Sequence, residues 1–248
     1  MLVRALGLAA AARALDRLAD ADGIPFAHPP RFGALNLGMA LGLRTNHREE
    51  ALDVGPQTRL PRAELAWSLY RAKTVAPGRL ASARSFAEIR LPVVSPAVRG
   101  VIEFGLRWVG QPYVWGGQTP YAPAMEPCCG GQSFPGFDCS GFVWWLFRAP
   151  AAGYDATAYR PYTGWTVRGR TADQLARGGK PRLTWRQARP GDLLFYDGDA
   201  DGTIEHVNVA LGNGWALDAS ASRGGVTVIS LADGWHRAHF TWALHVVR

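Results

Sequence analysis

The chain has 248 residues, of which 48% are hydrophobic and 19% are charged, and its net charge is +7. These proportions are typical of a folded globular protein and exclude wholesale disorder. The positive charge favours a polyanionic partner, for which nucleic acid, an anionic membrane and the anionic polymers of a cell wall are candidates. No Lys/Arg-rich run with interleaved aromatic residues is present, so we predict no nucleic-acid binding. No stretch of 18 apolar residues is present, so we predict no membrane span.

The opening segment, residues 1–23, combines Arg4 with an alanine-rich stretch, as a signal peptide does. Its apolar run before Arg13 is short, and apolar residues recur through the segment at helical spacing, namely Leu8, Ala11, Leu15 and Leu18. We therefore expect an amphipathic helix here and no export signal within this chain.

Residues 61–73 form a second predicted helix, with Pro61 at its first position and Glu64 in its first turn. Its last turn holds two cationic side chains, Arg71 and Lys73. This order of charges suits the helix dipole. One stripe of the helix is apolar and consists of Leu65, Leu69 and Ala72.

Residues 91–96 (LPVVSP) are a proline-containing segment that we interpret as a linker between residues 1–90 and residues 97–248. Ser95 is the expected N-cap of the following helix, with Pro96 at its first position. That helix carries a continuous apolar stripe, which predicts packing on a core and consists of Val98, Val101, Ile102, Gly105, Leu106 and Val109.

The chain has three cysteines, Cys128, Cys129 and Cys139. They form no CxxC pair, so neither a zinc ribbon nor a disulfide framework is indicated. Because the number is odd, at least one thiol is free.

Cys139 lies at the start of a nearly all-apolar run, residues 137–148 (FDCSGFVWWLFR), which a loop rich in Gly and Pro precedes. A helix of this composition is buried. A thiol at a helix N-terminus meets the positive end of the dipole and free amide protons, which favour the thiolate and can stabilise an oxyanion. The alternative is a structural cysteine, because cysteine is among the most buried residue types.

Two strands are predicted further along the chain. Residues 190–196 (PGDLLFY) are typical of a turn followed by a strand. Residues 205–211 alternate between two faces. One face carries Val207, Val209 and Leu211, and the other carries His206, Asn208 and Ala210.

The turn after these strands decides whether His206 and Asp218 meet. If residues 212–214 (GNG) form a three-residue loop, Asn208 pairs with Asp218, and His206 lies diagonally beside Asp218 on the same face. A two-residue loop would place the two side chains on opposite faces. The predicted His–Asp pair therefore depends on the length of the turn.

These residue types suit nucleophilic catalysis. A thiolate attacks a peptide carbonyl, a histidine holds the ion pair and then protonates the leaving amine, and a third polar group orients the imidazole. The other histidines are expected to be structural, and they are His28, His47, His236, His239 and His245. No HExxH or paired-ligand spacing is present, so we predict no metal and no cofactor.

Four motifs occur in the order and rough spacing of NlpC-type peptidoglycan peptidases, and they are YVWGG at 113–117, DCSGFV at 138–143, RPGDLLFY at 189–196 and HVNVALGNG at 206–214. Residues 97–248 thus resemble this family. The resemblance implies an α+β, papain-like fold in which a helix-borne cysteine packs against an antiparallel sheet that carries the histidine. It also implies cleavage of peptidoglycan stem peptides through a thioester acyl-enzyme, often between γ-D-glutamate and the diamino acid.

The resemblance assigns three catalytic roles, nucleophile, base and imidazole-orienting residue, to Cys139, His206 and Asp218 in that order. Tyr113 takes the tyrosine position beside the oxyanion site, and Asp138 and Ser140 belong to the oxyanion and substrate-binding part. In some members the carboxylate at the Asp138 position receives the free amine of the stem's first alanine. The alternative for Asp138 is a helix cap.

Two features depart from the family pattern. The third catalytic position is commonly histidine, whereas here it is Asp218, a carboxylate that can orient imidazole as well. Residues 118–136 lengthen the passage between the first two motifs, and we expect them to rim the cleft, where they shape substrate choice or act as a lid. Cys128 and Cys129 within this insertion are either exposed thiols or disulfide partners of another chain.

Residues 34–72 resemble an S-layer homology repeat, in which a helix, a Gly-containing turn and an extended loop precede a helix opened by Thr-Arg-Ala-Glu. Arg62 and Glu64 match the family's Arg and Glu, and Pro61 replaces its threonine. With the opening LVRALGL, about one and a half repeats are visible in the mostly helical residues 1–90. The resemblance implies binding to anionic secondary wall polymers, an extracellular, wall-associated location and an export signal upstream of this chain.

Three functions remain open at this point. The first is a cell-wall cysteine endopeptidase. The second is an acyl or amide transferase that uses the same thiol. The third is a non-catalytic wall-binding module on the same fold.

Overall fold

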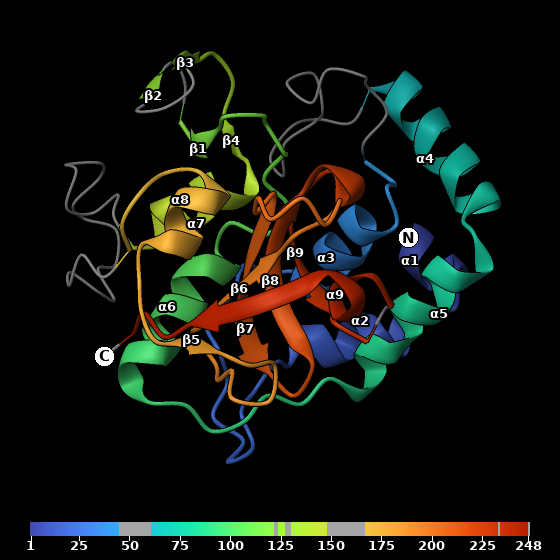
Figure 1. The fold of residues 1–248 in the computed structure, drawn as a ribbon. Coiled ribbons are helices and arrows are strands. Elements are labelled where there is room, and N and C mark those ends of the chain that lie inside the picture. Colours follow the sequence, from blue (N-terminus) through green and yellow to red (C-terminus); the bar gives the residue numbers. More distant parts are fainter. Residues whose placement is uncertain (45–60, 122–123, 127–129, 148–166, 233, 248) are drawn as a thin grey trace.

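The computed structural model describes residues 1–44, 61–121, 124–126, 130–147, 167–232 and 234–247, and an antiparallel six-stranded sheet lies at its centre (Figure 1). The strand order is β5-β10-β6-β7-β8-β9. These strands are β5 (Arg182–Leu183), β6 (Leu193–Tyr196), β7 (His206–Gly212), β8 (Trp215–Ser220), β9 (Gly225–Ser230) and β10 (Phe240–Leu244). Two small antiparallel pairs precede them, formed by β1 (Gln118–Thr119) with β4 (Gly136–Phe137) and by β2 (Ala124–Glu126) with β3 (Gly130–Gln132). The mixture of helices and antiparallel strands confirms the predicted α+β class.

The N-terminal part is helical, and its elements are α1 (Leu2–Ala5), α2 (Ala9–Asp16), α3 (Phe32–Ala40), α4 (Arg62–Thr74), α5 (Pro77–Ser85) and the 3-10 turn η2 (Phe86–Glu88). The opening helix is in two pieces, because Gly7, with a φ of +73°, adopts a left-handed conformation between α1 and α2. The predicted stripe is nevertheless buried throughout, at Leu8, Ala11, Leu15 and Leu18.

Helix α4 begins one residue later than predicted, with Pro61 as its N-cap instead of its first residue. Glu64 lies in the first turn and the cationic residues lie in the last turn, as the charge order indicated. The apolar stripe is only partly covered, since Ala72 packs against the core cluster but Leu65 is 46% and Leu69 is 47% exposed. Figure 1 shows the reason, which is that α4 runs along the outside of the molecule.

Residues 91–95 have no helical or strand structure, and α6 (Pro96–Leu106) follows them. Ser95 caps α6 as predicted, with its side chain accepting a hydrogen bond from the backbone N–H of Val98 (3.3 Å). One continuous cluster of buried residues includes side chains from both sides of this segment, such as Leu15 and Val101, and Leu91 itself is buried. The division of the chain into residues 1–90 and 97–248 stays a prediction.

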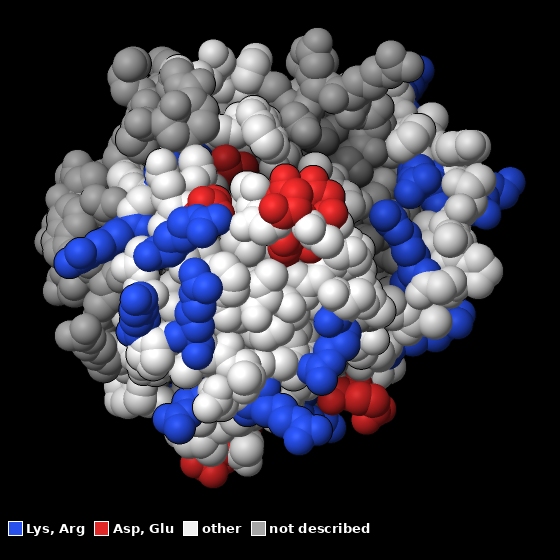
Figure 2. Space-filling model, viewed as in Figure 1, with Lys and Arg blue, Asp and Glu red and all other residues white. Residues whose placement is uncertain are grey.

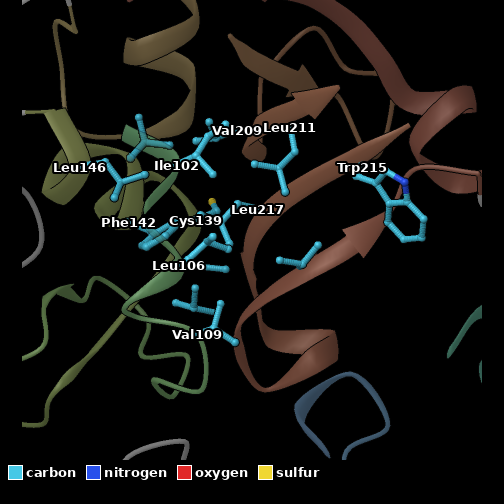
Figure 3. Packing of buried hydrophobic residues seen from close by; sticks show 14 of the residues in the cluster. Ile102, Leu106, Val109, Cys139, Phe142, Leu146, Val209, Leu211, Trp215 and Leu217 are labelled. Atoms are coloured by element: carbon cyan, nitrogen blue, oxygen red, sulfur yellow. The ribbon is translucent and has the colours of Figure 1, made fainter. Parts of the chain in front are cut away.

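The core that positions the site lies between the sheet and two helices, α6 and α7 (Cys139–Phe147). Every residue of α7 is buried, as its all-apolar composition predicted. Figure 3 shows side chains of α6 and α7 converging with those of β7 and β8, and the sulfur of Cys139 lies beside them. A cysteine at this boundary is held by the core on one side.

A second cluster covers the other face of the sheet and includes Tyr196, Ala210 and Ile229. Both faces of β7 are therefore buried. The remaining helical elements are α8 (Ala172–Arg177), the 3-10 turn η4 (Ala221–Arg223) and α9 (Gly234–His239). Within the described ranges, none of the helices has the length and apolar character that crossing a bilayer requires.

Candidate active site

Cys139 is the first residue of α7, and the loop before it is packed tightly against the start of the helix. The backbone N–H of Asp138 donates to the carbonyl oxygen of Gly117 (2.8 Å). A Cβ atom at Gly141 would stand 1.9 Å from the same oxygen, so a residue with a side chain does not fit there. This close approach holds the N-terminal turn of α7 in place and leaves Cys139 8% exposed.

A buried arginine, Arg170, forms hydrogen bonds with several groups of the same segment. The guanidinium of Arg170, whose side chain is 6% exposed, donates to both carboxylate oxygens of Asp138 (3.1 and 3.2 Å) and to the hydroxyl of Ser140 (2.9 Å). It also donates to the carbonyl oxygen of Gly116 (2.7 Å) and to the side chain of Gln118 (3.0 Å). One cation thus links the YVWGG loop to the start of the cysteine helix.

This arrangement bears on the predicted roles of Asp138 and Ser140. The Asp138 carboxylate accepts hydrogen bonds from the backbone N–H of Gly141 and from the Ser140 hydroxyl, in addition to Arg170. Both side chains are buried behind the cysteine, and neither lines the cavity described below. The geometry favours the helix-cap alternative for Asp138 over the binding of a substrate amine.

The strand pairing brings His206 and Asp218 onto one face of the sheet. Val209 lies opposite Leu217 on β8, which is the register that also places Asn208 opposite Asp218. This is the register that a three-residue GNG loop was expected to produce. The diagonal relation between the imidazole and the carboxylate follows from it.

The turn that produces this register differs from the prediction. Gly212 pairs with Trp215, so only Asn213 and Gly214 form the turn, and both have positive φ (51° and 80°). A bulge between Ala210 and Gly212 adds one unpaired residue to β7. Because the bulge and the shorter turn each shift the register by one residue, they cancel, and the side chains return to the predicted face.

The imidazole of His206 is held by a short hydrogen bond. Its Nε2 atom lies 2.7 Å from Oδ1 of Asp218, whose side chain is 2% exposed. Since Nε2 is used in this way, Nδ1 is the ring nitrogen that is available to the thiol. The Sγ atom of Cys139 lies 3.6 Å from the carbonyl oxygen of Glu205, directly before the histidine in the chain.

The electrostatics of the three side chains support an imidazolium. Burial alone would lower the pKa of His206, but the Asp218 carboxylate and the hydrogen-bonded Cys139 side chain raise that pKa well above its ordinary value. Burial would raise the pKa of Asp218, but the positive charges of His206, Arg223 and His236 lower it below its ordinary value. The pair is thus stabilised as imidazolium and carboxylate, which is the form that can hold a thiolate.

A cavity of about 490 Å³ opens onto these three side chains. It is also lined by Tyr113, which is 7% exposed, and by Trp235, which is 43% exposed. The predicted residues Tyr113, Cys139, His206 and Asp218 therefore share one cavity.

The other predicted site residues lie elsewhere. Arg62 and Glu64 are on α4 and do not line the cavity. Of the described residues in the insertion 118–136, none lines the cavity either. The insertion is held together at its base by the buried Gln132, whose side chain forms hydrogen bonds with the backbone of Thr119 and Gly136. Cys128 and Cys129 lie outside the described residues.

Three residues at the site escaped the sequence-based prediction. Arg170 belongs to no periodic pattern, and only its position in space reveals its partners. Trp235 carries no sequence signal for a cavity wall. His236, which was expected to be structural, is buried, lines the cavity and contributes to the lowered pKa of Asp218.

A cysteine at the start of a buried helix, facing a histidine–carboxylate pair on an antiparallel sheet, defines the papain-like class of folds. The model of the NlpC/P60 family matches residues 110–245, which is more than half of the chain. The chain belongs to the NlpC/P60 family.

Several relatives share this region. The bifunctional muramidase/DL-endopeptidase CwlT of Bacillus subtilis is 30% identical over 140 residues, which are 56% of this chain and 33% of CwlT. The peptidoglycan endopeptidase RipB of Mycobacterium tuberculosis is 36% identical over 132 residues, which are 53% of this chain and 47% of RipB. The murein DD-endopeptidase MepH of Escherichia coli is 26% identical over 179 residues, which are 71% of this chain and 54% of MepH. The chain thus spans a third to about half of these relatives.

Among solved structures, the peptidoglycan hydrolase RipB of Mycobacterium tuberculosis is similar, with a TM-score of 0.45 and 26% identity. The match covers 65% of this chain and 75% of that chain.

Proposed function

We propose that this protein is a cysteine endopeptidase that cuts the stem peptides of peptidoglycan. The observation that carries the proposal is the meeting of Cys139, His206 and Asp218 in one cavity, with the imidazole 2.7 Å from the carboxylate. Membership of the NlpC/P60 family and relatives that are named peptidoglycan endopeptidases support it.

In the proposed mechanism, the Cys139 thiolate attacks the carbonyl carbon of the scissile peptide bond and forms a tetrahedral oxyanion. Backbone amides at the start of α7, with Tyr113 beside them, stabilise this charge. The intermediate collapses to a thioester as the C–N bond breaks, and the His206 imidazolium gives its proton to the leaving amine. Neutral His206 then takes a proton from water, and the hydroxide formed attacks the thioester carbonyl. Breaking of the C–S bond releases the product and restores the thiolate–imidazolium pair. Asp218 keeps the imidazole oriented throughout.

The bond that we propose for cleavage joins γ-D-glutamate to the diamino acid of the stem. One relative is named a DL-endopeptidase and another a DD-endopeptidase, so the bond must be measured on this protein. Mass spectrometry of products from defined stem peptides identifies it directly, because each candidate bond yields fragments of different mass.

The N-terminal helices suit a supporting role at the wall. The S-layer homology resemblance of residues 1–90 leads us to propose that this part contacts anionic wall polymers through Arg62, which is exposed, near the buried Glu64. The protein would then act outside the cell, associated with the wall, with residues 97–248 as its catalytic part. Binding of purified wall polymer by wild-type protein and by Arg62→Ala tests this role, and equal binding would contradict it.

The activity is tested by incubating the protein with purified muropeptides and following peptide release. Cys139→Ala and His206→Ala are expected to abolish release. The matched control is Cys128→Ala/Cys129→Ala, which removes the other two thiols and is expected to keep release. Release that persists in Cys139→Ala would refute the proposal.

Two further outcomes would replace the proposal. Product that forms only when an amine acceptor is added would indicate a transferase. Retention on purified wall without any release, together with no alkylation of Cys139 by iodoacetamide, would indicate a non-catalytic binding module. The Cys128→Ala/Cys129→Ala variant suits the alkylation assay because Cys139 is then its only cysteine.

A further inference from the structure

The loop between β6 and β7 carries four carboxylates within nine residues. Residues 197–205 have the sequence DGDADGTIE, and each of its acidic side chains offers an oxygen within 4.8 Å of the others, namely Asp197, Asp199, Asp201 and Glu205. Figure 2 shows one compact group of acidic side chains on a face where basic side chains are spread apart. Four anions at this distance repel one another, and a cation between them would convert that repulsion into attraction.

One carboxylate oxygen of this group is buried without a partner. Oδ2 of Asp197 accepts a hydrogen bond from the backbone N–H of Gly202 (2.9 Å). Oδ1 of Asp197 is shielded from solvent, and no residue in the described part of the chain donates a hydrogen bond to it. A buried carboxylate oxygen is costly unless a donor or a metal satisfies it, so this atom marks a position for a bound ion.

The spacing of the acidic residues identifies the class of ion. Aspartates at the first, third and fifth positions, followed by glycine at the sixth, are the pattern of calcium-binding loops. Gly202 occupies the sixth position and has a φ of +88°, which suits the sharp turn required there. The donors of this loop are all carboxylates, so it lacks the histidine spacing that is typical of zinc sites.

The loop departs from that pattern at its end. Its twelfth position is Asn208, which is buried in β7 and accepts a hydrogen bond from the hydroxyl of Tyr196 (3.3 Å), so no bidentate glutamate is present there. Glu205, at the ninth position, supplies the fourth carboxylate instead. A site without the twelfth ligand fits the weaker class of calcium loops, with dissociation constants of about 10⁻⁴–10⁻³ M.

We propose that residues 197–205 form a calcium site in which Asp197, Asp199, Asp201 and Glu205 bind one ion. The ion stabilises the loop that leads directly into His206. The carbonyl oxygen of Glu205 faces the thiol of Cys139, so an ion on the Glu205 side chain also anchors the backbone at the candidate active site. The proposal does not depend on the peptidase activity and is tested by binding alone.

Terbium luminescence gives a direct test, because Tb³⁺ replaces Ca²⁺ in oxygen-ligand sites and emits when a nearby tryptophan is excited. The ring of Trp235 lies 3.7 Å from the position that a Cβ atom of Gly198 would occupy, so it is close enough to sensitise the ion. We expect sensitised emission from the wild-type protein that Ca²⁺ displaces. Trp235→Phe should lose most of this emission, and undiminished emission from that variant would place the ion elsewhere.

Thermal unfolding gives a second readout. At a calcium concentration about 100 times the dissociation constant, the melting temperature should rise by about 5–10 °C. Asp199→Asn/Asp201→Asn changes two exposed side chains and should lose both the rise and the emission. The matched control, Asp22→Asn, removes an exposed carboxylate far along the chain and should keep both.

Three results would overturn the proposal. The first is a wild-type protein with no calcium-dependent rise and no sensitised emission. The second is an Asp199→Asn/Asp201→Asn variant that keeps both. The third is an equal rise with Mg²⁺, since Mg²⁺ needs a tighter octahedral set of ligands and would contradict the assignment to calcium.

Discussion

Replacing Arg170 by methionine should be among the most damaging single changes in the protein. The guanidinium is 6% exposed and forms a salt bridge with Asp138, whose side chain is 12% exposed. Methionine fills much of the same space but cannot donate hydrogen bonds. The substitution therefore leaves the Asp138 carboxylate buried without its cation.

Removing one partner of a buried ion pair lowers the free energy of unfolding by about 3–5 kcal/mol. For a chain of this length each kcal/mol corresponds to about 2–4 °C, so the melting temperature of Arg170→Met should fall by about 6–20 °C. Peptide release should also fall at temperatures where the variant is folded, because Cys139 directly follows Asp138. Urea unfolding followed by tryptophan fluorescence measures the free energy.

A matched control exists on the surface. Arg177 pairs with Asp173 at 2.7 Å, but its side chain is 54% exposed and the pair is screened by solvent, so Arg177→Met should lower the unfolding free energy far less than Arg170→Met. The double variant Asp138→Asn/Arg170→Met should recover part of the loss, because no uncompensated charge remains. A loss in Arg170→Met no larger than in Arg177→Met would refute the reasoning.

Two further predictions concern the site. Asp218→Asn keeps a hydrogen-bonding group but removes the anion that raises the pKa of His206. The imidazolium is present below that pKa and is lost as the pH rises through it, so the alkaline limb of the pH profile of kcat/KM should move to lower pH; an unmoved limb would contradict this role. Gly141→Ala places a Cβ 1.9 Å from the backbone oxygen of Gly117 and should lower the unfolding free energy by at least about 1–3 kcal/mol. Gly78→Ala, which meets no atom within 4 Å on helix α5, should instead be neutral or stabilising by up to about 1 kcal/mol, and equal effects of the two substitutions in urea unfolding would disprove the packing argument.

Local patterns in the sequence were sufficient for the elements that carry the site. The all-apolar run after Asp138 predicted a buried helix with Cys139 at its start, because a helix end and its burial depend on neighbouring residues. The alternation along residues 206–211 predicted which face His206 occupies. The register with Asp218 was predicted only for a three-residue turn, and the two-residue turn with its compensating bulge was not foreseen.

Contacts between residues far apart in the chain could be found only in the tertiary structure. Arg170 lies 32 residues beyond Asp138, and no periodic pattern connects them. The direction of the Asp138 carboxylate, away from the cavity and toward Arg170, likewise depends on which buried cation the fold supplies. Trp235 and His236 line the cavity because the fold places α9, which carries both residues, beside it.

The sequence by itself thus determined the secondary structure around Cys139 and His206 and the face on which each side chain lies, because those properties arise from interactions over a few residues. Only the tertiary structure decided how the two meet, what holds them there and which neighbours surround them. The physical reason is that burial and charge pairing join segments whose separation along the chain leaves no local trace.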